Sequence, residues 1–326
     1  MESVLSVRDL SVGFQTREGM LTALDQISFE IGRGEILGMI GESGAGKSVA
    51  GAAIVGLVAS PGRKTGGSVY IGGERIDHYD EDQMRPIRGK RIGMIFQDPM
   101  TSLNPLLKVG EQLVETIRTH LDLSSVQARN RAIELLAETG IPDPEERIDA
   151  YPHEFSGGMR QRVVIALALC GEPELIIADE PTTALDVSVQ AQIIALIEKL
   201  CRERQTAVLL ITHDMGVIAR ATQRVAVMYA GRIIEMAPTA KLIGAPLHPY
   251  TLGLMQAIPP LHSRPRRLVQ INGSMPRLTA IPAGCAFNPR CSSAIDICHQ
   301  KRPLFEQRVE RSVACHLAEP VLARTE

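Results

Sequence analysis

Short apolar runs alternate with longer segments of helical periodicity over the first 245 or so residues. Strands are predicted where apolar residues run together, at 36–40, 175–178 and 208–211. Helices are predicted at 47–58, 163–170 and 189–204, where apolar residues cluster over longer segments or recur every three or four positions. Such alternation is typical of a mostly parallel sheet covered by helices. The chain is therefore expected to begin with an α/β domain.

Two segments depart from this alternation. Residues 110–147 are rich in helical patterns with polar faces, which indicates a helical subdomain inserted at about 99–160. Prolines recur beyond Gly244 and predict a loop-rich tail, and a small module with little core usually needs a staple. We therefore expect a domain at 1–245 and a smaller module at 246–326.

Composition narrows the classes of function. The 326 residues are 44% hydrophobic and 22% charged, as in an ordinary globular protein. A net charge of −2, with 3% aromatic residues, argues against nucleic acid as a partner. The longest apolar runs fall short of the roughly 18 residues that mark a membrane span. The N-terminus does not have the layout of a signal peptide. A cytosolic location is expected.

A phosphate-binding loop follows the first predicted strand. It fits the pattern G-x-x-x-x-G-K-[ST] and consists of Gly41, Glu42, Ser43, Gly44, Ala45, Gly46, Lys47 and Ser48. Its glycines allow backbone N–H groups to face phosphate oxygens, and the helix that follows adds positive potential. Lys47 is expected to reach the β and γ phosphates and Ser48 to ligate Mg²⁺. The implied ligands are ATP and Mg²⁺.

Two carboxylates follow the strand predicted at 175–178. Asp179 is expected to hold Mg²⁺ through water, and Glu180 to polarise the attacking water as general base. Two acids at a strand end are often merely solvated. Beside a phosphate-binding loop they predict an ATPase.

A second anion-binding device precedes the helix predicted at 163–170. Ser156, Gly157 and Gly158 would lie at a helix N-terminus, where backbone N–H groups attract phosphate. Two phosphate sites in one chain are explained if two chains pair head to tail. Each chain's phosphate-binding loop would then be covered by the Ser-Gly-Gly segment of the other.

Together these motifs resemble the ABC ATPases over essentially the whole chain. That family usually has Leu-Ser-Gly-Gly-Gln, where this sequence has Phe155 and Met159 at the first and last positions. The resemblance implies a P-loop NTPase fold with a RecA-like core and a helical subdomain. It also implies four site residues: Phe14 stacking on adenine, Gln97 touching metal and water, Asp186 of the loop 184–186 at the dimer interface, and His213 near the γ-phosphate. An apolar strand residue would look the same as Phe14.

Three segments resemble the peptide-import branch of the family: 97–105, His248-Pro249-Tyr250 and the cysteine-containing tail. This branch implies import of dipeptides or oligopeptides, although related members handle nickel, glutathione or sugars. It implies two membrane permeases, a second, paralogous ATPase and an extracytoplasmic binding protein as partners. The chain would sit at the cytoplasmic face of the inner membrane. Soluble ABC ATPases that act on DNA or ribosomes are the rival class, but they typically carry insertions or two cassettes that this sequence does not have.

The tail contains four cysteines: Cys285, Cys291, Cys298 and Cys315. Disulfides are disfavoured in the cytosol, whereas four thiolates suit either zinc or an iron–sulfur cluster. Their spacing alone does not decide between the two. An excess of basic residues nearby suits a negatively charged cluster, and the resemblance implies a [4Fe–4S] cluster, with zinc as the alternative. The expected role is structural or redox-sensing.

Overall fold

The computed structural model describes residues 3–17, 19–183, 185–257 and 270–318. The chain forms two sheets, and the smaller one, which is antiparallel, covers one side of the molecule. The small sheet has the strand order β2-β1-β4-β5. Its strands are β1 (Ser3–Thr16), β2 (Gly19–Gly32), β4 (Gly62–Ile71) and β5 (Glu74–Arg75). Alternate apolar residues of β1 and β2 face inward, and they form a core cluster with the first helix and the larger sheet.

The larger, mixed sheet has the order β11-β12-β10-β9-β3-β8-β7-β6. Its parallel strands are β3 (Ile36–Ile40), β6 (Ile92–Ile95), β7 (Leu175–Asp179), β8 (Ala207–Ile211) and β9 (Arg224–Tyr229), with β6 at the edge. Strands β3, β7 and β8 are buried along their whole length, as continuous apolar runs require in a sheet covered on both faces. The three strands predicted from the sequence are thereby confirmed.

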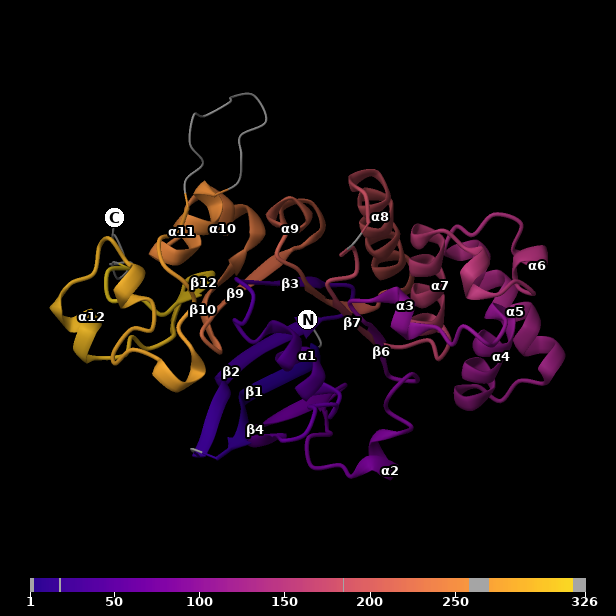
Figure 1. Ribbon diagram of the computed structural model, residues 1–326, viewed down its shortest axis with the longest axis horizontal. Coiled ribbons are helices and arrows are strands. Elements are labelled where there is room, and N and C mark those ends of the chain that lie inside the picture. Colours follow the sequence, from indigo (N-terminus) through magenta and orange to yellow (C-terminus); the bar gives the residue numbers. More distant parts are fainter. Residues whose placement is uncertain (1–2, 18, 184, 258–269, 319–326) are drawn as a thin grey trace.

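Helices cover this sheet and form the inserted subdomain. The covering helices are α1 (Lys47–Ile54), α8 (Val187–Arg204) and α9 (Met215–Ala221), whereas the short helix α2 (Glu81–Met84) lies away from the large sheet in Figure 1. The inserted segment contains α3 (Pro99–Ser102), α4 (Val109–His120), α5 (Ser125–Glu138), α6 (Pro144–Arg147), the 3-10 turn η1 (Pro152–Glu154) and α7 (Gly157–Leu169). Leu113, Ile117, Leu135 and Leu136 are fully buried, as their spacing predicted. This subdomain lies at one end of the molecule in Figure 1.

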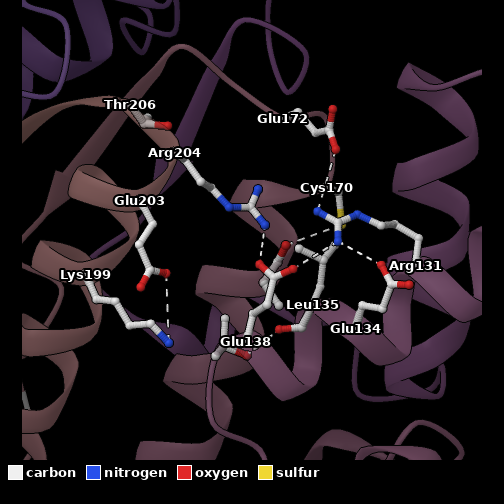
Figure 2. Close-up of polar contacts among 12 residues, drawn as sticks. Arg131, Glu134, Leu135, Glu138, Cys170, Glu172, Lys199, Glu203, Arg204 and Thr206 are labelled. Carbon is white, nitrogen blue, oxygen red and sulfur yellow. Dashed lines mark hydrogen bonds and ion pairs between the residues drawn. The ribbon is translucent and has the colours of Figure 1, made fainter.

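An ion-pair network joins the helical subdomain to the sheet domain (Figure 2). Arg131 of α5 bonds Glu134 and Glu138, each at 3.0 Å, and lies 3.6 Å from Glu172 in the turn after α7. Arg204, at the end of α8, bonds the other oxygen of Glu138. Burial alone would raise the pKa of Glu138, but the hydrogen bonds from both guanidinium groups outweigh it and lower that pKa. Glu138 is therefore held as a carboxylate between the two parts.

The C-terminal part of the chain packs against the opposite end (Figure 1). It contains α10 (Thr239–Gly244), α11 (Pro249–Gln256), the 3-10 turns η2 (Leu278–Ala280) and η3 (Asn288–Arg290), α12 (Asp296–Gln300), β11 (Glu306–Arg308) and β12 (Arg311–Val313). The prediction of a loop-rich tail is confirmed. Strand β12 pairs with β10 (Arg232–Pro238), so the large sheet continues into the tail. None of the helices in the described ranges combines the length and apolar character needed to cross a membrane.

Aromatic side chains form the junction between the tail and the sheet. The rings of Tyr229 and Phe287 meet edge to face at 5.3 Å between centroids, and those of Tyr250 and Phe287 at 5.4 Å. All three side chains are buried. The tail thus shares the core of the sheet domain instead of having to build one, and it has no need of the separate staple that its composition suggested.

Candidate functional site

The phosphate-binding loop, Asp179, His213 and Gln97 gather at the carboxyl ends of the parallel strands of the large sheet. Strands β3, β8, β7 and β6 are neighbours and parallel, so their carboxyl ends lie side by side. The phosphate-binding loop follows β3, Asp179 ends β7, His213 follows β8 and Gln97 follows β6. Open α/β sheets bind their ligands at this edge.

The backbone of the phosphate-binding loop depends on its glycines. Gly41 has a φ of 154°, and a Cβ placed there would lie 2.3 Å from the carbonyl oxygen of Met228. Gly46 caps α1 in the left-handed region, with a φ of 103°. The turn after β9 is bonded to this loop: the N–H of Gly231 donates to the carbonyl of Ala45 at 2.9 Å. Residues with side chains would not fit this path.

Lys47 is folded back over the loop. Its ammonium donates to the carbonyl oxygens of Gly41 at 2.8 Å and Glu42 at 3.1 Å, and the residue is 5% exposed. Burial lowers the pKa of Lys47, and the charges of Glu180, Asp179 and Glu42 only partly counteract this. A buried cation bonded only to carbonyls is suited to receive an anion, so the loop fits a nucleotide phosphate.

Ser48 and Asp179 form a pair of oxygen ligands beside this cation. The Ser48 hydroxyl donates to Asp179 Oδ1 at 3.0 Å. Burial raises the pKa of Asp179, against the opposing effects of Ser48 and Lys47. The Asp179 carboxylate and the Ser48 hydroxyl together offer oxygen ligands, which a hard cation such as Mg²⁺ prefers. A bound cation would also offset the cost of burying the carboxylate. Lys47 and Ser48 of the phosphate-binding loop are therefore brought together with Asp179, which was predicted from a separate motif.

Glu180 is the centre of a second group of side chains. Its Oε2 accepts hydrogen bonds from Gln97 Nε2 at 3.2 Å and Thr183 Oγ1 at 3.0 Å, and its Oε1 lies 3.4 Å from His213 Nδ1. Its φ of 48° is in the left-handed region, which costs free energy for a residue with a side chain. Thr183 was missed by the sequence analysis, although it lies three residues after Glu180.

The Ser-Gly-Gly segment lies apart from both groups. Ser156 caps α7, where its side chain accepts a hydrogen bond from the N–H of Met159 at 3.3 Å. Ser156 and Gly157 are exposed, whereas Phe155 is buried in the core of the subdomain. Within the described part of the chain, no hydrogen bond or ion pair links this segment to Lys47 or Glu180. The exposed N-terminus of α7 could therefore bind an anion that is not held by this chain's own phosphate-binding loop.

Two other predicted site residues, Phe14 and Asp186, lie outside these groups. Phe14 lies on β1 and packs partly buried against the core of the small sheet. Asp186 caps α8 and accepts hydrogen bonds from the N–H groups of Ser188 at 3.1 Å and Val189 at 3.0 Å. Ala184, predicted to belong to the same interface loop, lies outside the described residues.

Two residues of the tail reach the phosphate-binding loop, and sequence reasoning gave them no such role. Tyr250 Oη accepts the backbone N–H of Glu42 at 2.9 Å. Arg290 donates from its two terminal nitrogens to the Glu42 carboxylate at 3.1 and 3.0 Å. The contacts span 208 and 248 positions, so no local pattern could have indicated them.

The expectation of a [4Fe–4S] cluster, with zinc as the alternative, at Cys285, Cys291, Cys298 and Cys315 is wrong. Within residues 3–17, 19–183, 185–257 and 270–318, no three His, Cys, Asp or Glu side chains are placed to hold a metal ion. All four cysteines are free. Burial raises the pKa of Cys285 and Cys291, backbone hydrogen bonds partly oppose this, and the neighbouring cysteines add to it.

Comparison with known proteins identifies the family of this chain. The family model described as "ABC transporter" matches residues 24–183, and "Oligopeptide/dipeptide transporter, C-terminal region" matches residues 234–298. The oligopeptide transport ATP-binding protein OppD of Escherichia coli is 46% identical over 96% of this chain and 93% of its own length. The oligopeptide transport ATP-binding protein AppD of Bacillus subtilis is 44% identical over 98% of both chains. These names carry no mention of an iron–sulfur cluster.

A solved structure supports the fold. The ATP-binding cassette MJ0796, in a dimeric post-hydrolysis state bound to ADP and Pi, superposes with a TM-score of 0.65 at 30% identity, covering 72% of this chain and 98% of that one. The expected P-loop NTPase fold of the ABC ATPases is confirmed. The chain belongs to the ATP-binding proteins of the oligopeptide and dipeptide branch of the ABC transporter family.

Proposed function

We propose that this chain is the ATP-hydrolysing subunit that powers an importer of dipeptides or oligopeptides. The observation that carries the proposal is the arrangement around Lys47 and Glu180. A buried cation and a hydroxyl–carboxylate pair lie beside a second carboxylate that is held by Gln97 and Thr183. The domain at 1–245 would hydrolyse ATP, and the module at 246–326 is characteristic of the peptide branch.

Binding of the nucleotide is assigned to the loop from Gly41 to Ser48. Its amides and the Lys47 ammonium would hold the phosphates, and Phe14 would stack on the adenine. Ser48, Asp179 and Gln97 would hold Mg²⁺. Mg²⁺ offsets the negative charge of the phosphates when it is bound. Filling this site would bring phosphate charge into contact with the Lys47 ammonium, whose hydrogen bonds go to the carbonyl oxygens of Gly41 and Glu42.

Catalysis is assigned to Glu180 as the general base. Hydrogen bonds from Gln97 and Thr183 fix one oxygen of this carboxylate, and the other faces His213. A base so restrained can polarise a water molecule without reorganising. His213 is largely exposed and would turn toward the γ-phosphate from the end of β8.

A complete site requires a second ATPase subunit. Ser156, Gly157 and Gly158 would cover the nucleotide of a paralogous partner, with Asp186 at the interface. Support comes from the exposure of Ser156 and Gly157, from the separation of this segment from Lys47, and from the dimeric state named for MJ0796. The resulting heterodimer would close on ATP and reopen after hydrolysis.

A groove beside β6 is a surface for a membrane permease. Its volume is about 250 Å³, and its lining includes Leu57, Phe96, Val164 and Leu167. Leu57 and Phe96 are 44% and 45% exposed, which is unusual for large apolar side chains unless a partner covers them. Gln97, which bonds Glu180, directly follows Phe96, so a permease segment in the groove would be coupled to the position of Glu180.

The chain would thus bind two permeases at the cytoplasmic face of the inner membrane. The extracytoplasmic binding protein would be an indirect partner, and nucleic acid none.

Reconstitution tests the whole proposal. The chain, its partner ATPase and two permeases in liposomes should take up peptides only when ATP is present on the side of the ATPases. Lys47→Ala should abolish ATP binding and uptake, because the buried cation that faces the phosphates is removed. Uptake of nickel or a sugar, with no response to peptides, would overturn the assigned cargo. Peptide uptake without ATP would overturn the function.

A further inference from the structure

The phosphate-binding loop is held from behind by the C-terminal module. All three polar parts of Glu42 are occupied: its N–H by Tyr250, its carbonyl by Lys47, and its carboxylate by Arg290. Two of these three partners belong to the tail. Glu42 is the second residue of the loop, so its position determines where the next N–H groups and Lys47 lie.

Arg290 is itself fixed before it reaches Glu42. Its side chain is 6% exposed, and its Nε donates to the carbonyl of Asn272 at 2.8 Å. One terminal nitrogen also donates to Tyr229 Oη at 3.3 Å. A guanidinium that is held by these two contacts offers its remaining donors in one direction, which suits two-point contact with a carboxylate.

The turn that carries Arg290 is also rigid. Asn288 begins η3, and its side-chain amide donates to the carbonyl oxygens of Ala283 and Cys285, both at 2.8 Å, and of Cys298 at 3.3 Å. Phe287, which precedes it, packs against Tyr229 and Tyr250. The path from the module to the loop therefore runs through buried, hydrogen-bonded groups rather than through a flexible surface arm.

We infer that Arg290 is a positioning residue for ATP binding, through which the C-terminal module holds Glu42 and thereby the phosphate-binding loop in its receiving conformation. This inference rests on the proposed ATPase function and adds a role for the module. Without Arg290, Glu42 would keep only its backbone hydrogen bonds to Tyr250, Lys47 and Ala45, and the loop would sample conformations in which Lys47 and the amides do not converge. Affinity for ATP falls by the fraction of time spent in those conformations.

The experiment compares the affinity of full-length chains for Mg-ATP by calorimetric titration. Arg290→Ala should weaken binding about tenfold, equivalent to about 1.4 kcal/mol. Arg290→Lys should weaken it about threefold, since it restores the charge but not the two-point contact. Arg302→Ala is the matched control, because Arg302 lies in the same module and faces Asp25 at 3.7 Å rather than the loop. It should stay within twofold of the wild type.

A double-mutant cycle distinguishes positioning from general stability. Glu42→Ala and Glu42→Ala/Arg290→Ala should bind Mg-ATP equally weakly, since either change breaks the same contact. In hydrolysis assays the KM for ATP should rise about tenfold in Arg290→Ala while kcat changes less than threefold. Glu42→Ala and Arg290→Lys serve if Arg290→Ala does not fold.

Four outcomes overturn the inference or the function beneath it. Wild-type affinity in a folded Arg290→Ala chain, or fully additive losses in the double variant, would mean that Arg290 does not position the loop. Equal weakening by Arg302→Ala would mean that any loss from the module has this effect. A wild-type chain that does not bind Mg-ATP would instead overturn the proposed ATPase.

Discussion

Gln97 Nε2 donates a hydrogen bond to Glu180 Oε2 at 3.2 Å across 83 positions of sequence. The two residues follow the neighbouring parallel strands β6 and β7, so the sheet itself brings them together. Phe96, beside Gln97, lines the groove that we assign to a permease. Glu180, the proposed general base, and this groove are thus one residue and one hydrogen bond apart. A movement in the groove would change the position of the base.

Glu180→Gln should keep ATP binding and lower hydrolysis by about 10² to 10⁴-fold, the usual contribution of a general base. The amide is nearly the same size as the carboxylate but does not accept a proton. Turnover and nucleotide binding are measured in the assembly with the base of the partner ATPase also replaced. Thr183→Val should reduce turnover less, because it removes only one restraint. Near-normal hydrolysis by the Glu180→Gln assembly would contradict the assignment.

Ser156→Ala should lower hydrolysis about 10- to 100-fold, as expected for the loss of a hydrogen bond to a charged phosphate. The variant should keep normal ATP affinity as an isolated chain, because its own loop is intact. Ser124→Ala is the control, since Ser124 caps α5 in the same way but faces no phosphate. If both variants lose activity equally, the effect is one of capping. Specific activity of the wild type should also rise with concentration.

His248 should make stability depend on pH. Burial lowers its pKa from 6.5 to about 4, because the ring is enclosed beside Phe287 and its Nδ1 accepts the N–H of Tyr250. In the unfolded chain His248 is protonated below about pH 6.5, whereas in the folded chain it stays neutral down to about pH 4. The contribution of neutral His248 to the free energy of unfolding is therefore fully present above pH 6.5. It falls by about 3 kcal/mol as the pH drops from 6.5 to 4.

Unfolding in denaturant at several pH values measures this effect. His248→Asn should flatten the pH dependence, because asparagine can cap α11 without titrating. His299→Asn, which changes an exposed histidine of the same module, should leave it unchanged. A pH profile of His248→Asn that matches the wild type would show that another group is responsible.

Glu138→Gln should lower the free energy of unfolding by about 1 kcal/mol, which is the upper range for ion pairs with solvent access. The expected change in Tm is a few degrees. Two arginines bond this carboxylate, whereas among the described residues Glu203 in the same region pairs with Lys199 alone, at 3.9 Å (Figure 2). Glu203→Gln should therefore have almost no effect. Equal shifts for the two variants, or a difference that persists in 1 M salt, would contradict this account.

The parts of the site that depend on consecutive residues were predictable. The strand 36–40, the loop after it and the Lys47 position follow from apolar runs and glycine spacing, and the structure has them in that form. The contacts of Tyr250 and Arg290 with Glu42 were not predictable, because side chains from irregular segments carry no periodic signal. The cysteine prediction failed because it treated the tail as a separate small domain. In the structure, Phe287 shares its burial with Tyr229 and Tyr250.

The pairing of β12 with β10 gives the tail a protective role for the ATPase domain. Glu235 of β10 is fully buried and accepts the N–H groups of Leu247 at 2.8 Å and His248 at 2.9 Å. A chain truncated after residue 245 would leave this carboxylate without those donors and would turn β10 into an open edge strand. Unpaired edges recruit strands from other molecules. Such a fragment would aggregate before its enzymatic competence could be assessed.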